Sequence, residues 1–171
     1  MNQEGITLNS GLRRISARVN TEFKATNHFT FGLNTMFSDV KQDAFSEGTS
    51  YTSPFYSTVS KVTPSDPVYN EDGSWNRDFI GNGDRNPLLS MKYDSKKEYV
   101  TRFMNTLWGE YEFIDNLKFK STLSYDYQIN KSRNWYDPRT SNGDDYNGLE
   151  EDYMYERKKF NWSNQLTYKY T

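Results

Sequence analysis

The most acidic part of the chain carries the residue types that carboxylate chemistry requires. Its charges are Asp144, Asp145, Glu150, Glu151 and Asp152. Two positioned carboxylates perform glycoside hydrolysis, and clustered carboxylate oxygens bind calcium. A run of like charges is more typical of a solvated loop, and that is our interpretation. We therefore expect no catalytic residue and no metal site. If calcium were bound here, Asp144 and Asp145 would be the candidate ligands.

The other reactive residue types exclude most catalytic classes. The chain has no cysteine and a single histidine, His28. It therefore lacks thiolate zinc ligands, the two or three histidines common in catalytic zinc sites, and a second histidine for a serine triad. No glycine-rich phosphate loop is present. We expect a protein that is not an enzyme and holds no cofactor.

Four aromatic residues could bind a ligand without bond chemistry. They are Tyr69, Trp75, Trp135 and Tyr136, and all fall in segments that we predict to be long loops. Exposed rings at such places can stack on sugars, which makes these residues substrate-contact candidates. Packing of the rings inside folded loops is the competing interpretation.

Alternation of apolar and polar residues is the main structural signal, and it is clearest over residues 117–130. Successive strand residues point to opposite faces, so alternation predicts strands with one apolar side. Ser121 interrupts the apolar side of this strand, and Asn105 and Trp108 break the pattern of the strand before it. The predicted strands are residues 13–24, 28–40, 98–113, 117–130 and 160–170. Before Lys158 the last strand would need a bulge to keep its parity.

Two long connections separate these strands, over residues 41–97 and 131–159. The first contains four prolines, the Asp72-Gly73 pair and the cluster at residues 81–84, which are turn signals. No stretch has convincing helical spacing. Connections this long are rare in compact domains and are usually functional.

Several features favour lipid over a protein core as the partner of the apolar sides. Only 34% of residues are hydrophobic, while 17% are aromatic, and the predicted strands are about double the usual length. Short and long connections alternate, and rings concentrate near both strand ends, as in outer-membrane barrels. The sequence therefore predicts an all-β fold: an antiparallel meander that forms a five-strand segment of a transmembrane outer-membrane β-barrel, with two long extracellular loops.

Five strands cannot close a barrel, for which about eight is the lower limit. The first twelve residues also lack the pattern of a signal peptide. If the chain is exported, we expect it to be one part of a longer protein. The net charge of -2 and the lack of a basic stripe exclude nucleic acid as an expected partner.

Short motifs along the chain resemble one protein family. Residues 2–6 (NQEGI), 13–20 (RRISARVN), 69–75 (YNEDGSW) and 86–88 (NPL), and the hairpin over residues 102–124, occur in the order found in SusC/RagA-type TonB-dependent outer-membrane transporters. The resemblance implies a barrel of about 22 strands with an N-terminal plug, energised by the TonB complex. It also implies a SusD-like surface lipoprotein as partner, and uptake of oligosaccharides or peptides across the bacterial outer membrane.

Three other functions stay open at this point. A soluble all-β carbohydrate-binding module would pack the same apolar faces against each other. A β-rich glycosidase would need two positioned carboxylates. A purely structural barrel or adhesin would have the same strands without a plug.

Overall fold

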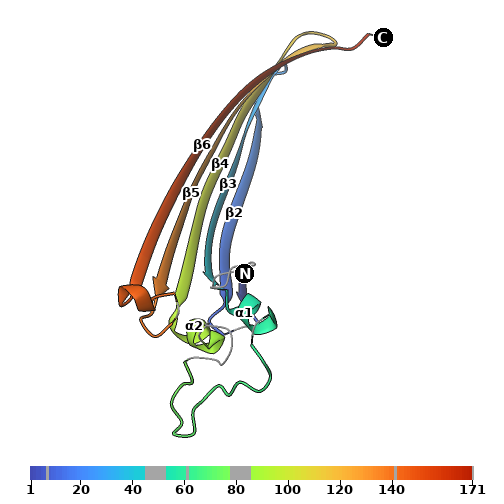
Figure 1. Cartoon of the computed structure of the whole chain (residues 1–171). Coiled ribbons are helices and arrows are strands. Elements are labelled where there is room, and N and C mark those ends of the chain that lie inside the picture. Colours follow the sequence, from blue (N-terminus) through green and yellow to red (C-terminus); the bar gives the residue numbers. More distant parts are fainter. Residues whose placement is uncertain (7, 45–52, 61, 78–85, 141, 171) are drawn as a thin grey trace. The chain divides into compact units, whose positions relative to one another are not determined.

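The chain folds as a single antiparallel sheet. The computed structural model describes residues 1–6, 8–44, 53–60, 62–77, 86–140 and 142–170. Its six strands pair in sequence order, β1-β2-β3-β4-β5-β6, as Figure 1 shows for β2 to β6. The prediction of an all-β antiparallel meander is confirmed.

The strands are longer than the sequence predicts. They are β1 (Asn2–Glu4), β2 (Gly11–Lys24), β3 (Phe29–Ala44), β4 (Ser95–Ile114), β5 (Leu117–Tyr136) and β6 (Leu149–Tyr168). The predicted loop over residues 131–159 is wrong at both ends, because β5 and β6 extend into it. These extensions carry polar residues on both sides, so apolar alternation cannot reveal them. Cross-strand pairs such as Arg133 with Asp152, at 3.0 Å, hold them instead.

The first strand, β1, is absent from the prediction of five strands. It pairs Asn2 with Arg13 and Glu4 with Gly11 of β2. Three residues are too few to establish a period of two. The last strand, β6, runs unbroken from Leu149 to Tyr168, so Tyr153 and Tyr155 simply lie on the side opposite Phe160.

Tight turns join the strands of both hairpins. In the first, the Thr26 hydroxyl accepts hydrogen bonds from the backbone N–H groups of His28 and Phe29. In the second, Asn116 takes a positive φ of 73°, which its short polar side chain tolerates. Both turns were predicted from the sequence.

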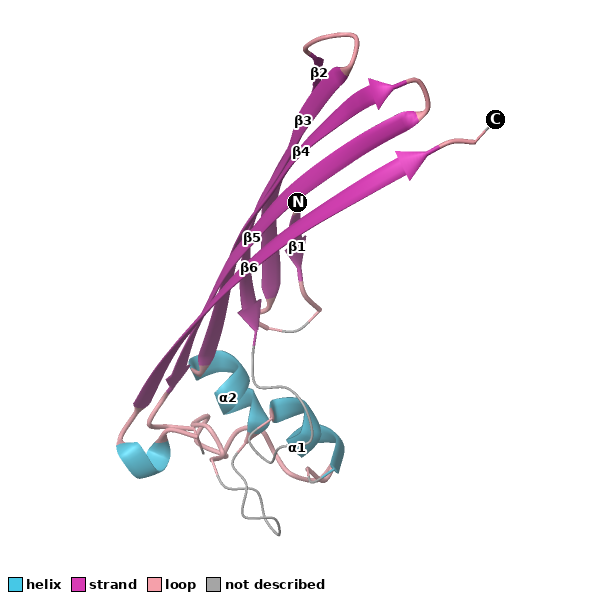
Figure 2. Cartoon of the chain, turned by 90° about the horizontal axis from the view of Figure 1, so that it is seen from above, coloured by secondary structure: helices cyan, strands magenta, loops and turns pink. Residues whose placement is uncertain are grey.

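Short helices occur within the long connections, contrary to the sequence analysis. They are α1 (Pro54–Ser60), α2 (Pro87–Tyr93) and the 3-10 helix η1 (Asp144–Tyr146); Figure 2 shows them in cyan. Each is too short to display a 3.6-residue period. Asn86 caps α2 and Pro87 begins it, a start signal that the sequence does contain. No helix within the described ranges is long and apolar enough to cross a membrane.

Two compact units make up the chain. Unit 1 comprises residues 1–13, 41–99 and 131–154, and unit 2 comprises residues 14–40, 100–130 and 155–171. Unit 1 contains the long connections, and unit 2 contains both tight turns. The cluster at residues 81–84 lies outside the described residues.

One side of the sheet in unit 2, here named the apolar face, carries the odd-numbered residues of β2 to β5 and the even-numbered residues of β6. Aromatic rings follow one another along it. The distances between ring centroids are 5.5 Å for Phe23 and Phe31, 6.4 Å for Phe29 and Tyr111, and 5.0 Å for Tyr111 and Phe113. Its large side chains are exposed, for example Phe160 at 67% and Trp162 at 65%. Leu89 of unit 1 is the single buried hydrophobic residue among those described. Within the part of the chain that the structure describes, no protein core therefore covers the apolar face.

The polar interruptions of the apolar face are paired across strands. The Ser121 hydroxyl accepts a hydrogen bond of 3.0 Å from the Trp162 indole N–H. Asn105 Oδ1 accepts one of 2.7 Å from the Thr35 hydroxyl. Each pair satisfies donors and acceptors that would otherwise be costly in an apolar environment.

The opposite side of the sheet in unit 2, the polar face, carries the even-numbered residues of β2 to β5 and the odd-numbered residues of β6. Trp108, which breaks the alternation of the sequence, lies on this face over Gly32. The Lys120 ammonium group lies above it, 4.4 Å from the ring centroid. Arg102 forms a bidentate pair with Asp126, in which two guanidinium N–H groups each donate a hydrogen bond of 2.8 Å to the carboxylate. The alternation predicted for these strands is therefore realised by contacts on both faces.

Candidate functional site

A small hairpin in unit 1 presents two of the four aromatic candidates. Tyr69 and Trp75 form an antiparallel bridge, and their ring centroids are 4.7 Å apart. Between them Gly73 has a φ of 81°, which favours glycine. Asp72 accepts hydrogen bonds from the Ser74 N–H and hydroxyl, and these bonds lower the pKa of Asp72. The turn predicted at Asp72-Gly73 is confirmed.

Asn86 anchors this hairpin to helix α2. Its side chain is fully buried, and its amide group donates to the carbonyl oxygens of Val68 and Asn76, both at 3.0 Å. Its Oδ1 accepts from the Leu88 N–H, which caps the helix. One side chain thus connects both strands of the hairpin to the beginning of α2.

Asp94 connects the end of α2 to the segment that follows β5. Its carboxylate accepts hydrogen bonds from the Asp137 N–H at 2.9 Å, the Thr140 hydroxyl at 2.8 Å and the Asn142 amide at 3.1 Å. Burial raises the pKa of Asp94, and these hydrogen bonds oppose the rise. The local sequence around Asp94 does not indicate these distant partners, so the pattern of residues alone does not predict its role.

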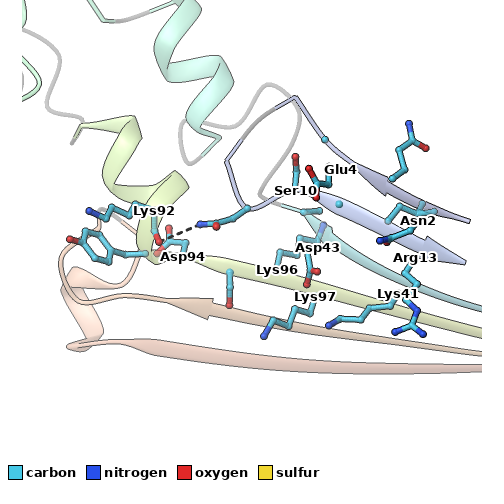
Figure 3. Close-up of a pocket in the computed structure, with 18 residues that line it drawn as sticks. Asn2, Glu4, Ser10, Arg13, Lys41, Asp43, Lys92, Asp94, Lys96 and Lys97 are labelled. Atoms are coloured by element: carbon cyan, nitrogen blue, oxygen red, sulfur yellow. Dashed lines mark hydrogen bonds between the residues drawn. The ribbon is translucent and has the colours of Figure 1, made fainter.

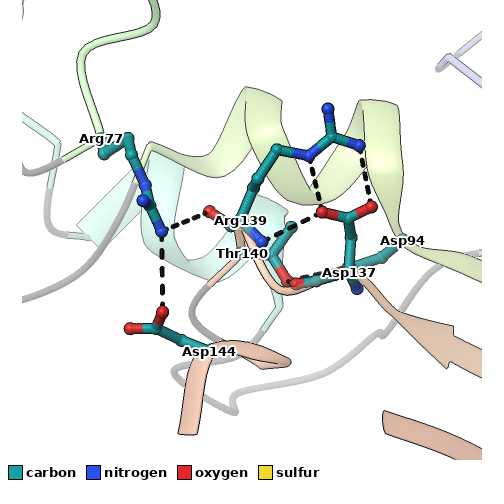
Figure 4. A network of polar contacts seen from close by, with 6 residues as sticks. All are labelled: Arg77, Asp94, Asp137, Arg139, Thr140 and Asp144. Atoms are coloured by element: carbon teal, nitrogen blue, oxygen red, sulfur yellow. Dashed lines mark hydrogen bonds and ion pairs between the residues drawn. The ribbon is translucent and has the colours of Figure 1, made fainter. Parts of the chain in front are cut away.

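Arg139 extends this network toward the hairpin, as Figure 4 shows. Its guanidinium group forms two hydrogen bonds with Asp137, at 2.7 and 2.8 Å, and these lower the pKa of Asp137. The same guanidinium lies 3.6 Å from the centroid of the Tyr93 ring. Asp137 therefore fixes Arg139 where it stacks on Tyr93.

A groove of about 650 Å³ lies beside these residues. Its lining consists of Asn70, Ser74, Trp75, Asn76, Arg77, Leu89 and Arg139. The Trp75 ring supplies an apolar surface. The Tyr93 ring meets it edge-on, with 6.3 Å between the ring centroids, and the Lys92 ammonium group lies 5.0 Å from the Trp75 ring centroid. An aromatic wall with amide and guanidinium groups can hold a polyhydroxylated ligand, and the volume lies within the range of small-molecule sites.

The four aromatic candidates do not form one site. Tyr69 packs on Trp75, whereas Trp135 and Tyr136 are the last two residues of β5 and not loop residues. A Cβ on Gly148 would lie 3.1 Å from the Trp135 ring, so this ring covers the turn before β6. The structure adds Tyr93, Arg139 and Asn76 to the residues around Trp75, and no sequence signal indicated them.

The acidic candidates lie at the 3-10 helix. Asp144 is 3.6 Å from the Arg77 guanidinium, which also donates to the Arg139 carbonyl oxygen. The described residues contain no group of three or more acidic or histidine side chains arranged to hold a metal ion. Asp144 therefore takes part in an ion pair that links the first long connection to the second.

A second hollow in unit 1, of about 760 Å³, lies between β1, β2, β3 and the start of β4 (Figure 3). Its lining mixes cations such as Arg13, Lys41 and Lys97 with the carboxylates of Glu4 and Asp43. Asn9 connects its rim to α2 by donating to the Met91 carbonyl oxygen at 2.9 Å. The mixed charges of this hollow do not define a ligand class.

An antiparallel meander with one exposed apolar face, a polar opposite face and long connections is consistent with a segment of a membrane β-barrel wall. Among curated proteins, TonB-dependent receptor P26 of Formosa agariphila is 24% identical over 143 residues, which cover 82% of this chain and 14% of that receptor. TonB-dependent receptor P3 of the same organism is 28% identical over 129 residues, covering 72% of this chain and 13% of the receptor. No family model matches the chain.

These comparisons show distant homology to TonB-dependent receptors over most of the chain. The chain spans only 13–14% of the length of the two curated relatives. Any activity of a complete receptor is therefore a proposal for this chain.

Proposed function

We propose that the chain forms part of the barrel wall of a SusC/RagA-type, TonB-dependent importer in the bacterial outer membrane. The observation that carries this proposal is the uncovered apolar face of unit 2, which extends over five strands. Monomeric proteins in water rarely expose contiguous apolar patches larger than about a few hundred Å². Distant homology to two TonB-dependent receptors supports the same class of protein.

In this proposal, the apolar face contacts lipid and the polar face lines the lumen or contacts a plug. The tight turns are periplasmic and the long connections are extracellular, as in bacterial barrels generally. The importer works with a SusD-like surface lipoprotein and the TonB complex, and it takes up oligosaccharides or peptides. The chain performs no bond chemistry.

Uptake is tested in cells that express the gene containing this chain. We expect a labelled oligosaccharide or peptide to accumulate in these cells and not in cells lacking the gene. Accumulation should also require an intact TonB complex. Equal accumulation with and without the gene would contradict the proposal.

The groove beside Trp75 is the proposed ligand contact within the long connections. Trp75 lines this groove and Tyr69 packs against the Trp75 ring, whereas Trp135 lies elsewhere in unit 1. We therefore expect Trp75→Ala to weaken oligosaccharide binding about tenfold, the effect of one lost ring contact. Trp135→Ala and Tyr136→Ala, the two other candidates, are matched tests. Unchanged affinity in every variant would exclude sugar contact by these rings.

The soluble carbohydrate-binding module remains the alternative function. It requires the apolar face of unit 2 to be covered by protein, and the described residues supply no second layer. A monodisperse monomer that folds cooperatively in water without detergent would favour this alternative.

A further inference from the structure

The polar face of unit 2 is strongly cationic away from the tight turns. Its charged side chains there are Arg14, Arg18, Arg102, Arg157, Lys159 and a single carboxylate, Asp126. Toward the tight turns the same face is balanced, because three lysines accompany three glutamates: Lys24, Lys118 and Lys120 with Glu22, Glu110 and Glu112. Only the half of this face farther from the turns has a net positive charge.

Asp126 cannot neutralise Arg157 in addition to Arg102. Both of its carboxylate oxygens accept hydrogen bonds from Arg102, at 2.8 Å each. Arg157 approaches no closer than 3.9 Å to the same carboxylate and donates instead to Gln128 Oε1, at 2.6 Å. The charge of Arg157 therefore has no carboxylate of its own among the described residues.

Arg157 also has an unused donor. Its Nε atom is buried and has no hydrogen-bond partner within the described part of the chain. A guanidinium group binds carboxylate and sulfate groups through parallel N–H donors. The Arg157 side chain as a whole is 33% exposed, so an oxygen anion that reaches this surface can pair with the charge of the guanidinium group.

The neighbouring strands leave space beside these cations. A hollow of about 400 Å³ on unit 2 is lined by Arg18, Asn20, Asn34, Thr35, Met36, Met104 and Thr106. Arg18 spans β2 and β3, with its guanidinium 3.7 Å from Met36 Sδ. Because thioether sulfur is only a weak acceptor, this contact leaves the charge of Arg18 available.

We propose that this cationic half of the polar face selects anionic solutes, namely oligosaccharides that carry carboxylate or sulfate groups. This inference rests on the proposed importer, in which the polar face meets the passing substrate. Cations that line a confined, low-dielectric passage attract anions and raise their local concentration. Neutral sugars of equal length gain nothing from this field. A carboxylate-rich segment of the same protein is the competing occupant.

Lys159 and Lys158 provide a matched pair for the test. They are adjacent in β6 and therefore point to opposite faces. Lys159 is on the cationic half of the polar face, whereas Lys158 lies on the apolar side, 3.0 Å from Glu156 and 5.7 Å from the Tyr127 ring centroid. Replacing either lysine by glutamine removes the same charge from the same strand.

The experiment measures calorimetric binding of an oligogalacturonate and of a neutral malto-oligosaccharide of equal length to the complete receptor that contains this chain, in lipid bilayers. We expect the oligogalacturonate to bind about tenfold more tightly, and this preference to fall at high salt. Lys159→Gln should weaken oligogalacturonate binding about threefold, the size of one screened charge contact. Lys158→Gln should leave it unchanged.

Equal affinity for the two sugars would overturn the proposal, and so would equal effects of the two lysine variants. Binding of an acidic peptide in place of the oligogalacturonate would assign the surface to a segment of the protein itself and would also overturn it. Bilayer insertion is measured separately on the same samples. A receptor that inserts without preferring the anion contradicts only this inference and leaves the proposed importer intact.

Discussion

The Trp108 indole occupies the space that Gly32 leaves on the neighbouring strand of unit 2. A Cβ at position 32 would lie 2.6 Å from both Cε2 and Nε1 of that ring, and 2.7 Å from the Thr21 carbonyl oxygen. Glycine is therefore required here by close packing. Its contact with Trp108 explains how a large ring is accommodated on an otherwise polar face.

Gly32→Ala should destabilise the sheet of unit 2. The added methyl group displaces Trp108 and presses on backbone that cannot move freely, so we expect a loss of about 1–3 kcal/mol. Thermal unfolding in detergent, followed by circular dichroism, measures it. Gly109→Ala is the control, because its Cβ would meet only the Phe29 ring at an ordinary 3.4 Å. Equal losses in both variants would contradict the role of Trp108.

The removal of Asp126 should cost more than the removal of Arg102. Asp126→Asn leaves two guanidinium groups, of Arg102 and Arg157, without their shared carboxylate, whereas Arg102→Gln leaves Asp126 with Arg157 nearby. We expect about 2 kcal/mol for the first variant and about 1 kcal/mol for the second. Chemical unfolding of the two single variants and of the double variant gives the coupling energy. Additive losses would show that the pair is not coupled.

Asn86→Ala should disorder the hairpin that carries Tyr69 and Trp75. It removes the cap of α2 and leaves the carbonyl oxygens of Val68 and Asn76 without their donor. We expect a loss of about 2–4 kcal/mol in local stability. Hydrogen exchange of the peptide covering residues 67–77 measures it, with Ser65→Ala as a control at an exposed position. Unchanged exchange in the Asn86 variant would contradict its anchoring role.

Acid should release Arg139 from its position on Tyr93. Because Arg139 lowers the pKa of Asp137 below its ordinary 3.8, the carboxylate contributes stability above about pH 3.8, which is lost as the pH falls through the lowered value. Hydrogen exchange of residues 137–140 should increase over this range. Asp137→Asn should abolish that dependence on pH.

Asp94, in the same network, should affect the pH dependence of stability in the opposite direction to Asp137. Its raised pKa means that the folded chain binds this proton more readily than the unfolded chain, so Asp94 itself favours folding at acid pH. In Asp94→Asn, the loss of stability in acid should therefore be steeper than in the unaltered chain. A shallower loss would show that Asp94 is not held in a desolvated position.

The sequence indicates the strands well where one face is apolar. The alternation in residues 117–130 and in the hairpin over residues 13–40 appears in the structure with the predicted faces. It fails for the outer parts of β5 and β6, where Arg133, Asp152 and Glu150 pair across strands, because a strand that is polar on both sides has no hydrophobic period.

The candidate site was less predictable than the strands. Trp75 and Tyr69 could be selected because rings in turn-rich segments are conspicuous. The contacts that Asn86, Asp94 and Arg139 make within the site could not be predicted, since they reach partners distant in sequence, such as Val68 for Asn86 and Tyr93 for Arg139. No local pattern specifies which distant group a polar side chain will meet.

Contact between the apolar face and lipid is the central claim, and two tryptophans test it directly. Trp162 lies on the apolar face with 65% of its surface exposed, whereas Trp108 lies on the polar face beneath Lys120. The chain has four tryptophans, so single-tryptophan variants are made by changing the other three to phenylalanine. Each variant is then inserted into bilayers of brominated lipid, and tryptophan fluorescence is measured. We predict that bromine quenches Trp162 and leaves Trp108 bright; equal quenching of both, or stronger quenching of Trp108, would contradict a lipid-facing apolar side.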